Sequence, residues 1–181
     1  VKPEGTVSQL TGTASGIHAN HSQYYIRRVR SDNKDPLTQF LKDSGFPWEP
    51  CVMKPDSTTV FSFPMAVAST AVFRDELTAI QHLDLWLTYQ RHYCEHKPSV
   101  TISVREEEWM DVGAWTYKHF NEVTGVSFLP MDGGTYKQAP YEECDEEAYN
   151  RLKLLQPEGI DWDSFKEYDD NVEGAQMLSC T

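Results

Sequence analysis

The pattern of hydrophobic and polar positions changes near residue 58, and from there it predicts strands and helices in alternation. Three short stretches read as strands: residues 59–63, 100–104 and 125–129. Apolar residues at helical spacing predict two helices, from Asp75 to His96 and from Glu106 to about Asn121. This β-α-β-α-β order favours right-handed crossovers and an α/β sheet that is at least partly parallel.

Capping residues mark three more helices outside that alternation. Ser22 is a plausible cap for a helix over residues 22–29. Asp35 as N-cap and Pro36 at the first helical position open a short helix that Gly45 ends. A last helix is expected over residues 145–156, where a proline follows.

The chain is long enough for one compact domain with a trailing arm. Its 181 residues, 39% hydrophobic and 24% charged, are typical of a globular protein. We expect three parts: an N-terminal loop and helical segment at 1–57, an α/β segment at 58–160 and an arm at 161–181. The arm is acidic and poor in aliphatic residues, so it should be mobile and dock loosely through Trp162, Phe165 and Tyr168.

The net charge of −12 limits the classes of partner. It argues against a general nucleic-acid surface, because neutralising phosphates needs clustered Lys and Arg. A small anion such as a nucleotide needs only a few local donors, which the backbone can supply. No apolar run approaches the ~20 residues of a membrane span and no signal-peptide pattern is present, so we expect a soluble, cytoplasmic protein without a membrane partner.

Cysteines and histidines form no recognisable metal or disulfide pattern. The four cysteines lie far apart, without a C-x-x-C pair: Cys51, Cys94, Cys144 and Cys180. His92 and His96 share a helix face but lack a third ligand at a useful spacing. His18 and His21 are better explained by hydrogen bonding at a helix end. No metal site is predicted.

The basic cluster of Arg27, Arg28 and Arg30 is open to two interpretations. Arginine suits bidentate pairing with carboxylate or phosphate, so one of the three could orient a substrate or a neighbouring segment. On a helix, however, the three side chains would point in different directions, and at most two could face one ligand. The acidic run at 106–108 is explained by the positive end of a helix dipole.

The first eight residues combine a turn, a flexible point and two hydroxyls in the order that an anion-binding loop needs. Pro3 stiffens the approach, and Gly5 lets the backbone come close to a ligand or adopt a positive φ. Thr6 and Ser8 add hydroxyls beside free N–H groups, as in backbone sites that hold phosphate. The same residues are also ordinary turn chemistry, so the run alone does not decide between the two.

Four runs in this order resemble the C-terminal part of the adenosylcobalamin-dependent (class II) ribonucleotide reductases. They extend over nearly all of the chain: KPEGTVS at 2–8, GTASGIH at 12–18, YYIRRVR at 24–30 and QAPYEE at 138–143. Four motifs in the right order are far more specific than any one of them. The resemblance implies a part of the α/β barrel of these reductases, with a flexible C-terminal arm.

It also implies the reaction of the complete enzyme, the conversion of ribonucleotides to 2′-deoxyribonucleotides. In that family, adenosylcobalamin generates a cysteine thiyl radical that abstracts the ribose 3′ hydrogen, and two cysteines then reduce the 2′ carbon as water leaves. The radical cysteine, the catalytic glutamate and the first reducing cysteine lie upstream of the phosphate loop and are not in this sequence. The chain alone should therefore be inactive and bind little or no adenosylcobalamin.

By this resemblance, the substrate phosphates contact the backbone of Gly5, Thr6 and Val7 and the hydroxyls of Thr6 and Ser8. Many reductases carry a small hydroxyl residue where this chain has Glu4. A carboxylate close to a polyphosphate would repel it unless it were turned outward, so the phosphate contacts are assigned to these backbone groups and hydroxyls and not to the Glu4 side chain.

Cys180 is a candidate for the redox shuttle that brings electrons from an external thioredoxin-type reductant, with its partner cysteine beyond Thr181. An incidental thiol in a polar tail is the alternative. The chain starts at Val1, directly on a motif, and we expect a piece of a larger protein whose partners are the ribonucleotide and the remainder of the reductase. The competing hypothesis is a non-catalytic α/β interaction or regulatory module, such as a subunit of a split reductase.

Overall fold

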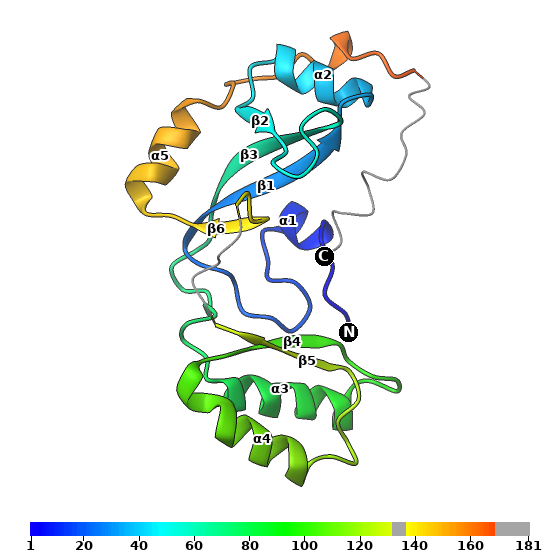
Figure 1. Cartoon of the computed structure of the whole chain (residues 1–181), viewed down its shortest axis with the longest axis vertical. Helices are drawn as coiled ribbons and strands as arrows, with labels where there is room; N and C mark the ends of the chain where they lie inside the picture. The colour runs from blue at the N-terminus through cyan, green and yellow to red at the C-terminus, as the bar shows by residue number, and fades with distance from the viewer. Residues whose placement is uncertain (132–136, 169–181) are drawn as a thin grey trace. The chain divides into compact units, whose positions relative to one another are not determined.

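The computed structural model describes residues 1–131 and 137–168, and it divides the chain into two compact units (Figure 1). The first joins Val1–Gln23 to Val67–Thr135, and the second joins Tyr24–Ala66 to Tyr136–Thr181. Each unit is thus built from two separate stretches of sequence. This division crosses the expected segments 1–57 and 58–160, because the strand at 24–32 pairs with the strand at 58–66.

The first unit contains a parallel β-α-β arrangement, as the sequence predicts. β4 (Val100–Val104) and β5 (Val126–Pro130) pair in parallel, and α4 (Trp109–Lys118) connects them after a 3-10 turn at Glu106–Glu108. α3 (Ala79–His92) precedes β4 and lies with α4 on one side of the two strands (Figure 1).

The hydrophobic core of this unit forms where the strands meet the two helices. Trp86 of α3 and Ile102 of β4 are fully buried. The indole N–H of Trp86 donates to the carbonyl oxygen of Pro98 at 3.0 Å, so its polar group is satisfied. Val112 and Trp115 attach α4 to the same core.

Helix α3 is capped by Thr78, so the predicted cap at Asp75 was wrong. The Thr78 hydroxyl accepts the Gln81 N–H at 3.1 Å, and the Gln81 carboxamide oxygen accepts the Thr78 N–H at 2.9 Å. The carbonyl oxygen of Asp75 instead accepts a hydrogen bond from the Arg105 guanidinium. The helix also ends at His92, four residues before its predicted end.

The second unit is built on a four-stranded antiparallel sheet with the order β2-β3-β1-β6. Its strands are β1 (Tyr24–Asp32), β2 (Trp48–Pro50), β3 (Thr58–Ala66) and β6 (Tyr141–Glu143). β1 pairs with β3 along its whole length and with β6 on its other side. Helix α5 (Glu146–Leu154) packs against β3 and β1, while α2 (Pro36–Asp43) follows β1 in the chain.

Residues 24–32 form a strand, so the predicted helix at 22–29 was wrong. Aromatic and β-branched residues at 24, 25, 26 and 29 suit a pleated surface, and strand pairing on both sides outweighs the local cap at Ser22.

The place of β3 also differs from expectation. The predicted alternation made it the first strand of a partly parallel sheet, but it pairs antiparallel with β1 and β2. The parallel pairing is therefore limited to β4 and β5, and the described residues do not form a closed barrel.

Two predicted helix starts are confirmed. The Asp35 carboxylate accepts the Leu37 N–H at 2.8 Å at the start of α2. The Asp145 carboxylate accepts the Ala148 N–H at 2.7 Å at the start of α5. Both caps satisfy N–H groups that a helix cannot pair internally. None of the helices in the described residues is long and apolar enough to cross a membrane.

The described part of the predicted arm packs through two of its aromatic residues. The rings of Trp162 and Phe165 lie 5.5 and 5.2 Å from the ring of Phe40, centroid to centroid. Tyr168 is 63% exposed. Docking by Trp162 and Phe165 therefore agrees with the prediction, whereas the rest of the arm at 169–181 lies outside the described residues.

Candidate functional site

Glu4 accepts hydrogen bonds from the backbone of the loop that follows it. One carboxylate oxygen lies 3.0 Å from the Thr6 nitrogen, and the other lies 3.0 Å from the Ser8 nitrogen. The exposed Glu4 side chain is therefore turned back onto its own loop. The physical reason is the cluster of free N–H groups at the start of a helix, which attracts the nearest anion.

The short helix α1 (Val7–Thr11) lacks a conventional cap, and Glu4 replaces it. Its N-cap residue, Thr6, makes no capping hydrogen bond with its side chain. The Ser8 side chain and backbone, with the N–H groups of Thr6 and Val7, hold the pKa of Glu4 below its usual value. The loop thus carries a negative charge of its own at neutral pH.

Ser15 and Gly16, in the GTASGIH run, hold the N-terminal loop in place. The Glu4 N–H donates to the Ser15 hydroxyl at 2.7 Å, and this hydroxyl donates to the Glu4 carbonyl oxygen at 2.7 Å. Gly16 has a φ of 60°, and a Cβ there would lie 3.1 Å from the Lys2 carbonyl oxygen. The glycine therefore permits both the backbone conformation and the close approach of the loop.

The predicted phosphate-binding residues differ in their exposure. Thr6 and Val7 are exposed and Gly5 is half-buried, but Ser8 is only 3% exposed. The structure thus directs the N–H groups of Thr6 and Ser8 to one anion, the Glu4 carboxylate, while the Ser8 side chain is buried. The role of these residues in substrate binding stays a prediction.

The redox candidate Cys180 lies outside the described residues. Of the other cysteines, Cys51 has an unusual setting in the second unit. Burial acts to raise its pKa, but the N–H groups of Met53 and Lys54 and the Arg30 side chain outweigh it, so the pKa of the thiol is lowered. The pKa of Cys144 is raised by burial and by neighbouring carboxylates.

The three clustered arginines bind three consecutive carbonyl oxygens in the second unit. Arg30 donates to the oxygen of residue 138 at 2.9 Å, Arg28 to that of residue 139 at 3.4 Å, and Arg27 to that of residue 140 at 3.3 Å. Residues 138–140 lead into β6, the strand that pairs with β1, so they lie beside β1 within reach of all three side chains, although Arg27 points to the opposite face from Arg28 and Arg30. Of the two interpretations, these contacts match the orientation of a neighbouring segment.

Gln138 fixes the other side of that segment. Its side-chain oxygen accepts the Val52 N–H at 2.8 Å, and its side-chain nitrogen donates to the Pro50 carbonyl oxygen at 2.9 Å. The residue is 8% exposed and has a φ of 59°, which is rare outside glycine. The QAPYEE run is therefore held by side chains on both flanks. The sequence showed the run, but not the partners at 50 and 52.

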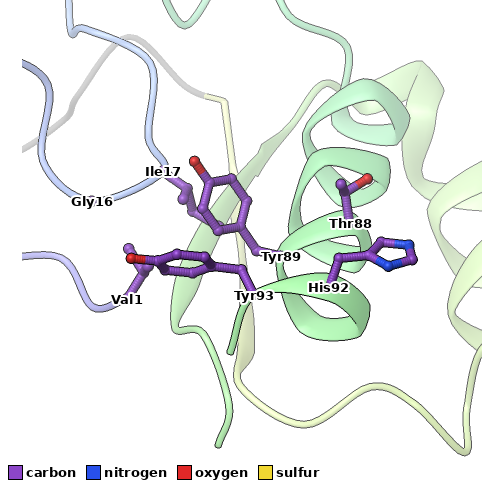
Figure 2. A pocket seen from close by; sticks show the side chains of 7 residues that line it. All are labelled: Val1, Gly16, Ile17, Thr88, Tyr89, His92 and Tyr93. Carbon is purple, nitrogen blue, oxygen red and sulfur yellow. The ribbon is translucent and has the colours of Figure 1, made fainter. Parts of the chain in front are cut away.

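A cavity of about 560 Å³ opens in the first unit beside the end of α3. Figure 2 shows the rings of Tyr89 and Tyr93 on one side of the helix, with their hydroxyls toward Ile17 and Val1, and His92 on another side. The two rings meet edge to face with centroids 5.6 Å apart. In the part of the chain that the structure describes, no group of three or more His, Cys, Asp or Glu could hold a metal ion.

Comparison with known proteins identifies relatives of one kind. The chain is 31% identical over 182 residues to an adenosylcobalamin-dependent ribonucleoside-triphosphate reductase of Euglena gracilis, covering 99% of this chain and 25% of the relative. The protein of that name from Levilactobacillus brevis is 31% identical over 154 residues, and a probable one from Dictyostelium discoideum is 32% identical over 158. No protein-family model matches.

The fold is similar to a solved structure of the same class. A crystal structure of a B12-dependent (class II) ribonucleotide reductase matches with a TM-score of 0.76 at 25% sequence identity. The match covers 96% of this chain and 24% of the solved one. The chain therefore spans about a quarter of the length of the proteins that it resembles.

Proposed function

The chain is homologous to a segment of the adenosylcobalamin-dependent (class II) ribonucleotide reductases, and we propose that it forms part of an enzyme that reduces ribonucleotides to 2′-deoxyribonucleotides. The observation that carries this proposal is the coverage of almost the whole chain by one class of relative, in sequence and in fold. The comparisons do not favour the alternative of a non-catalytic module.

The chain supplies only part of that reaction. Adenosylcobalamin would supply the radical chemistry in the complete enzyme, and we assign its binding mainly to the remainder of the reductase. This segment contributes β4, α4 and β5 to the α/β barrel and positions the substrate.

The substrate-phosphate loop is the proposed contribution of residues 5–8. Support comes from the N–H groups of Thr6 and Ser8, which already bind a carboxylate and so have the direction that an anion needs. Gly5 and Val7 add backbone N–H groups, and Thr6 and Ser8 add hydroxyls. A phosphate reaches these donors when Glu4 moves away.

A redox role is proposed for Cys180, outside the described residues. In this role the thiol passes electrons from a thioredoxin-type reductant to the cysteines of the active site by thiol–disulfide exchange. The N-terminal loop and the terminal cysteine then serve one reaction, the first by holding substrate and the second by renewing the reducing thiols.

The proposal is tested by assaying two proteins side by side. The 181-residue chain and the complete reductase that contains it are each incubated with adenosylcobalamin, a dithiol and a ribonucleotide, and 2′-deoxyribonucleotide is measured by chromatography. We expect product from the complete protein only, and only with the cofactor. Turnover by the chain alone, or a complete protein without cofactor-dependent reduction, would refute the assignment.

A further inference from the structure

Helix α4 is apolar on two opposite faces. Val112 and Trp115 pack into the core of the first unit. On the other side, Met110 and Tyr117 are each 85% exposed. A helix of a soluble domain normally has one apolar face, and a second one indicates a second contact.

The exposed face has the spacing of a packing surface. Met110, Gly113, Ala114 and Tyr117 follow the i, i+3, i+4, i+7 pattern, so they share one side of the helix, and all four are exposed. We call this set the outer α4 face. A Cβ built on Gly113 meets nothing within 4 Å, so the small residues in its middle leave room between two large side chains. Another backbone can approach closely there.

We propose that the outer α4 face docks against polypeptide of the same reductase that lies outside these 181 residues. The inference rests on the proposed function, because the relatives are about four times as long as the segment that they share with this chain. Most of such a protein therefore lies outside this chain, and it provides the surface that would cover an otherwise exposed apolar face.

The charge around the outer α4 face defines the chemistry of the partner. Glu106 and Glu107 in the turn before the helix, Asp111 within it and Lys118 in its last turn are all exposed, so acidic groups outnumber basic ones around this face. A second copy would bring the same acidic groups and a net charge of −12 to the contact, and like charges oppose association. The complementary surface therefore has an apolar centre and a rim of Lys or Arg.

Photo-cross-linking in the complete reductase tests the identity of the partner. The photoreactive residue p-benzoylphenylalanine replaces Tyr117, whose exposure leaves room for it, and a control protein carries the same residue at Tyr93, 74% exposed on the first unit. We expect irradiation to join position 117 to a peptide of the same polypeptide outside the 181 residues, with Lys or Arg nearby. A cross-link to a second copy, or none at position 117, would overturn the proposal.

A charged substitution in the outer α4 face gives a second test of docking. Gly113→Arg places a large cation in the open middle of the outer α4 face, and Gly159→Arg does the same at another glycine with open space around it. Because glycine is a poor residue for a helix interior, we expect Gly113→Arg to keep or raise the melting temperature of the 181-residue chain but to lower that of the complete reductase, whereas Gly159→Arg lowers neither. An unchanged melting temperature of the complete reductase with Gly113→Arg would contradict docking.

The two proposals fail separately. A complete wild-type protein that reduces ribonucleotides but shows no cross-link at position 117 keeps the proposed function and loses the docking surface. A complete protein without reductase activity that still cross-links within one polypeptide loses the proposed function, while the contact itself stands.

Discussion

The Glu4 carboxylate lies 3.0 Å from the backbone nitrogen of Ser8, so the N-terminal loop already holds an anion of its own. The second carboxylate oxygen does the same for the N–H of Thr6. These are two of the donors proposed for the substrate phosphates. A nucleotide that uses them competes with a side chain that is covalently attached and always present.

Removing the charge of Glu4 should therefore strengthen nucleotide binding in the complete reductase. Glu4→Gln keeps the size of the side chain but removes the anion that opposes the phosphates. From the usual strength of a charge at a helix start, we expect the KM for the ribonucleotide to fall about two- to fivefold, measured in steady-state assays. Glu95→Gln, at an exposed carboxylate of the same unit, is the control and should have no effect. A higher KM for Glu4→Gln would mean that the carboxylate helps to form the site.

Removing the hydroxyls of the loop should have the opposite effect and weaken nucleotide binding. Thr6→Ala together with Ser8→Ala removes two donors from the proposed phosphate site, so the KM of the complete enzyme should rise, by about fivefold or more for two lost hydrogen bonds to a charged group. Because Ser8 is buried, the melting temperature of the variant has to be measured as well. Thr124→Ala, at an exposed hydroxyl of the first unit, serves as the control. An unchanged KM and kcat would remove the assignment.

Two helix starts were predicted correctly because their signals are local. Asp35 and Asp145 each cap a helix through an N–H two or three residues later, so the sequence holds both partners side by side. The strand at 24–32 has its partners at 58–66 and 141–143, beyond the reach of any local pattern. The hydrogen bonds of Glu4 to its own loop could not be predicted, because they depend on the turn that its own carboxylate stabilises.

Acid should destabilise the first unit through two histidines whose pKa is lowered in the folded state. Burial and the nearby Arg74 lower the pKa of His21 from 6.5 to about 4, and burial, followed by the charge of His18, lowers the pKa of His82. Below pH 6.5 the unfolded chain binds a proton at His21 that the folded chain binds only near pH 4, and His82 acts in the same direction. The contribution of these histidines to the free energy of unfolding is therefore complete above pH 6.5 and is lost as the pH falls toward 4.

The measurement is urea unfolding at pH 7.0, 5.5 and 4.5. Between pH 7.0 and pH 4.5, the free energy of unfolding of His21→Gln should fall by about 1–2 kcal/mol less than that of the wild type, after allowance for the partial exposure of the ring. His92→Gln, at an exposed histidine, should leave the fall unchanged. Equal pH dependence in the wild type and in His21→Gln would show that His21 is not held neutral.

Gln138 should be a stability determinant of the second unit. Gln138→Ala leaves the Val52 N–H and the Pro50 carbonyl without their partner, at a cost of about 1–3 kcal/mol. Gln138→Gly loses the same bonds but relaxes the positive φ, so it should cost less than alanine. Urea midpoints compare both with Gln39→Ala, an exposed control. A glycine variant less stable than the alanine variant would contradict the backbone argument.

The QAPYEE run and the arginine cluster stand out in the sequence as separate motifs, but nothing in the sequence shows that they meet. The hydrogen bonds from Arg30 to residue 138 and from Gln138 to residue 50 join positions that lie 108 and 88 residues apart. Arginines at adjacent helical positions would diverge, whereas residues 138–140 lie beside β1 and accept hydrogen bonds from side chains on both of its faces. One incorrect assignment of secondary structure therefore hid the contact between two motifs that were each recognised.

The last prediction concerns the redox role of Cys180. Comparing turnover with two kinds of reductant tests this role without knowledge of where the residue lies. If this thiol carries electrons inward, Cys180→Ser in the complete reductase should abolish repeated turnover with a thioredoxin-type protein, because a serine cannot exchange disulfides. A single turnover of pre-reduced enzyme, and turnover with a small dithiol, should persist, since these bypass the shuttle. Cys144→Ser, at a partly buried thiol whose pKa is raised, is the control and should keep all three activities. Full thioredoxin-supported turnover in the Cys180→Ser enzyme would make that thiol incidental, whereas loss of all three activities would indicate a structural defect in place of a lost relay.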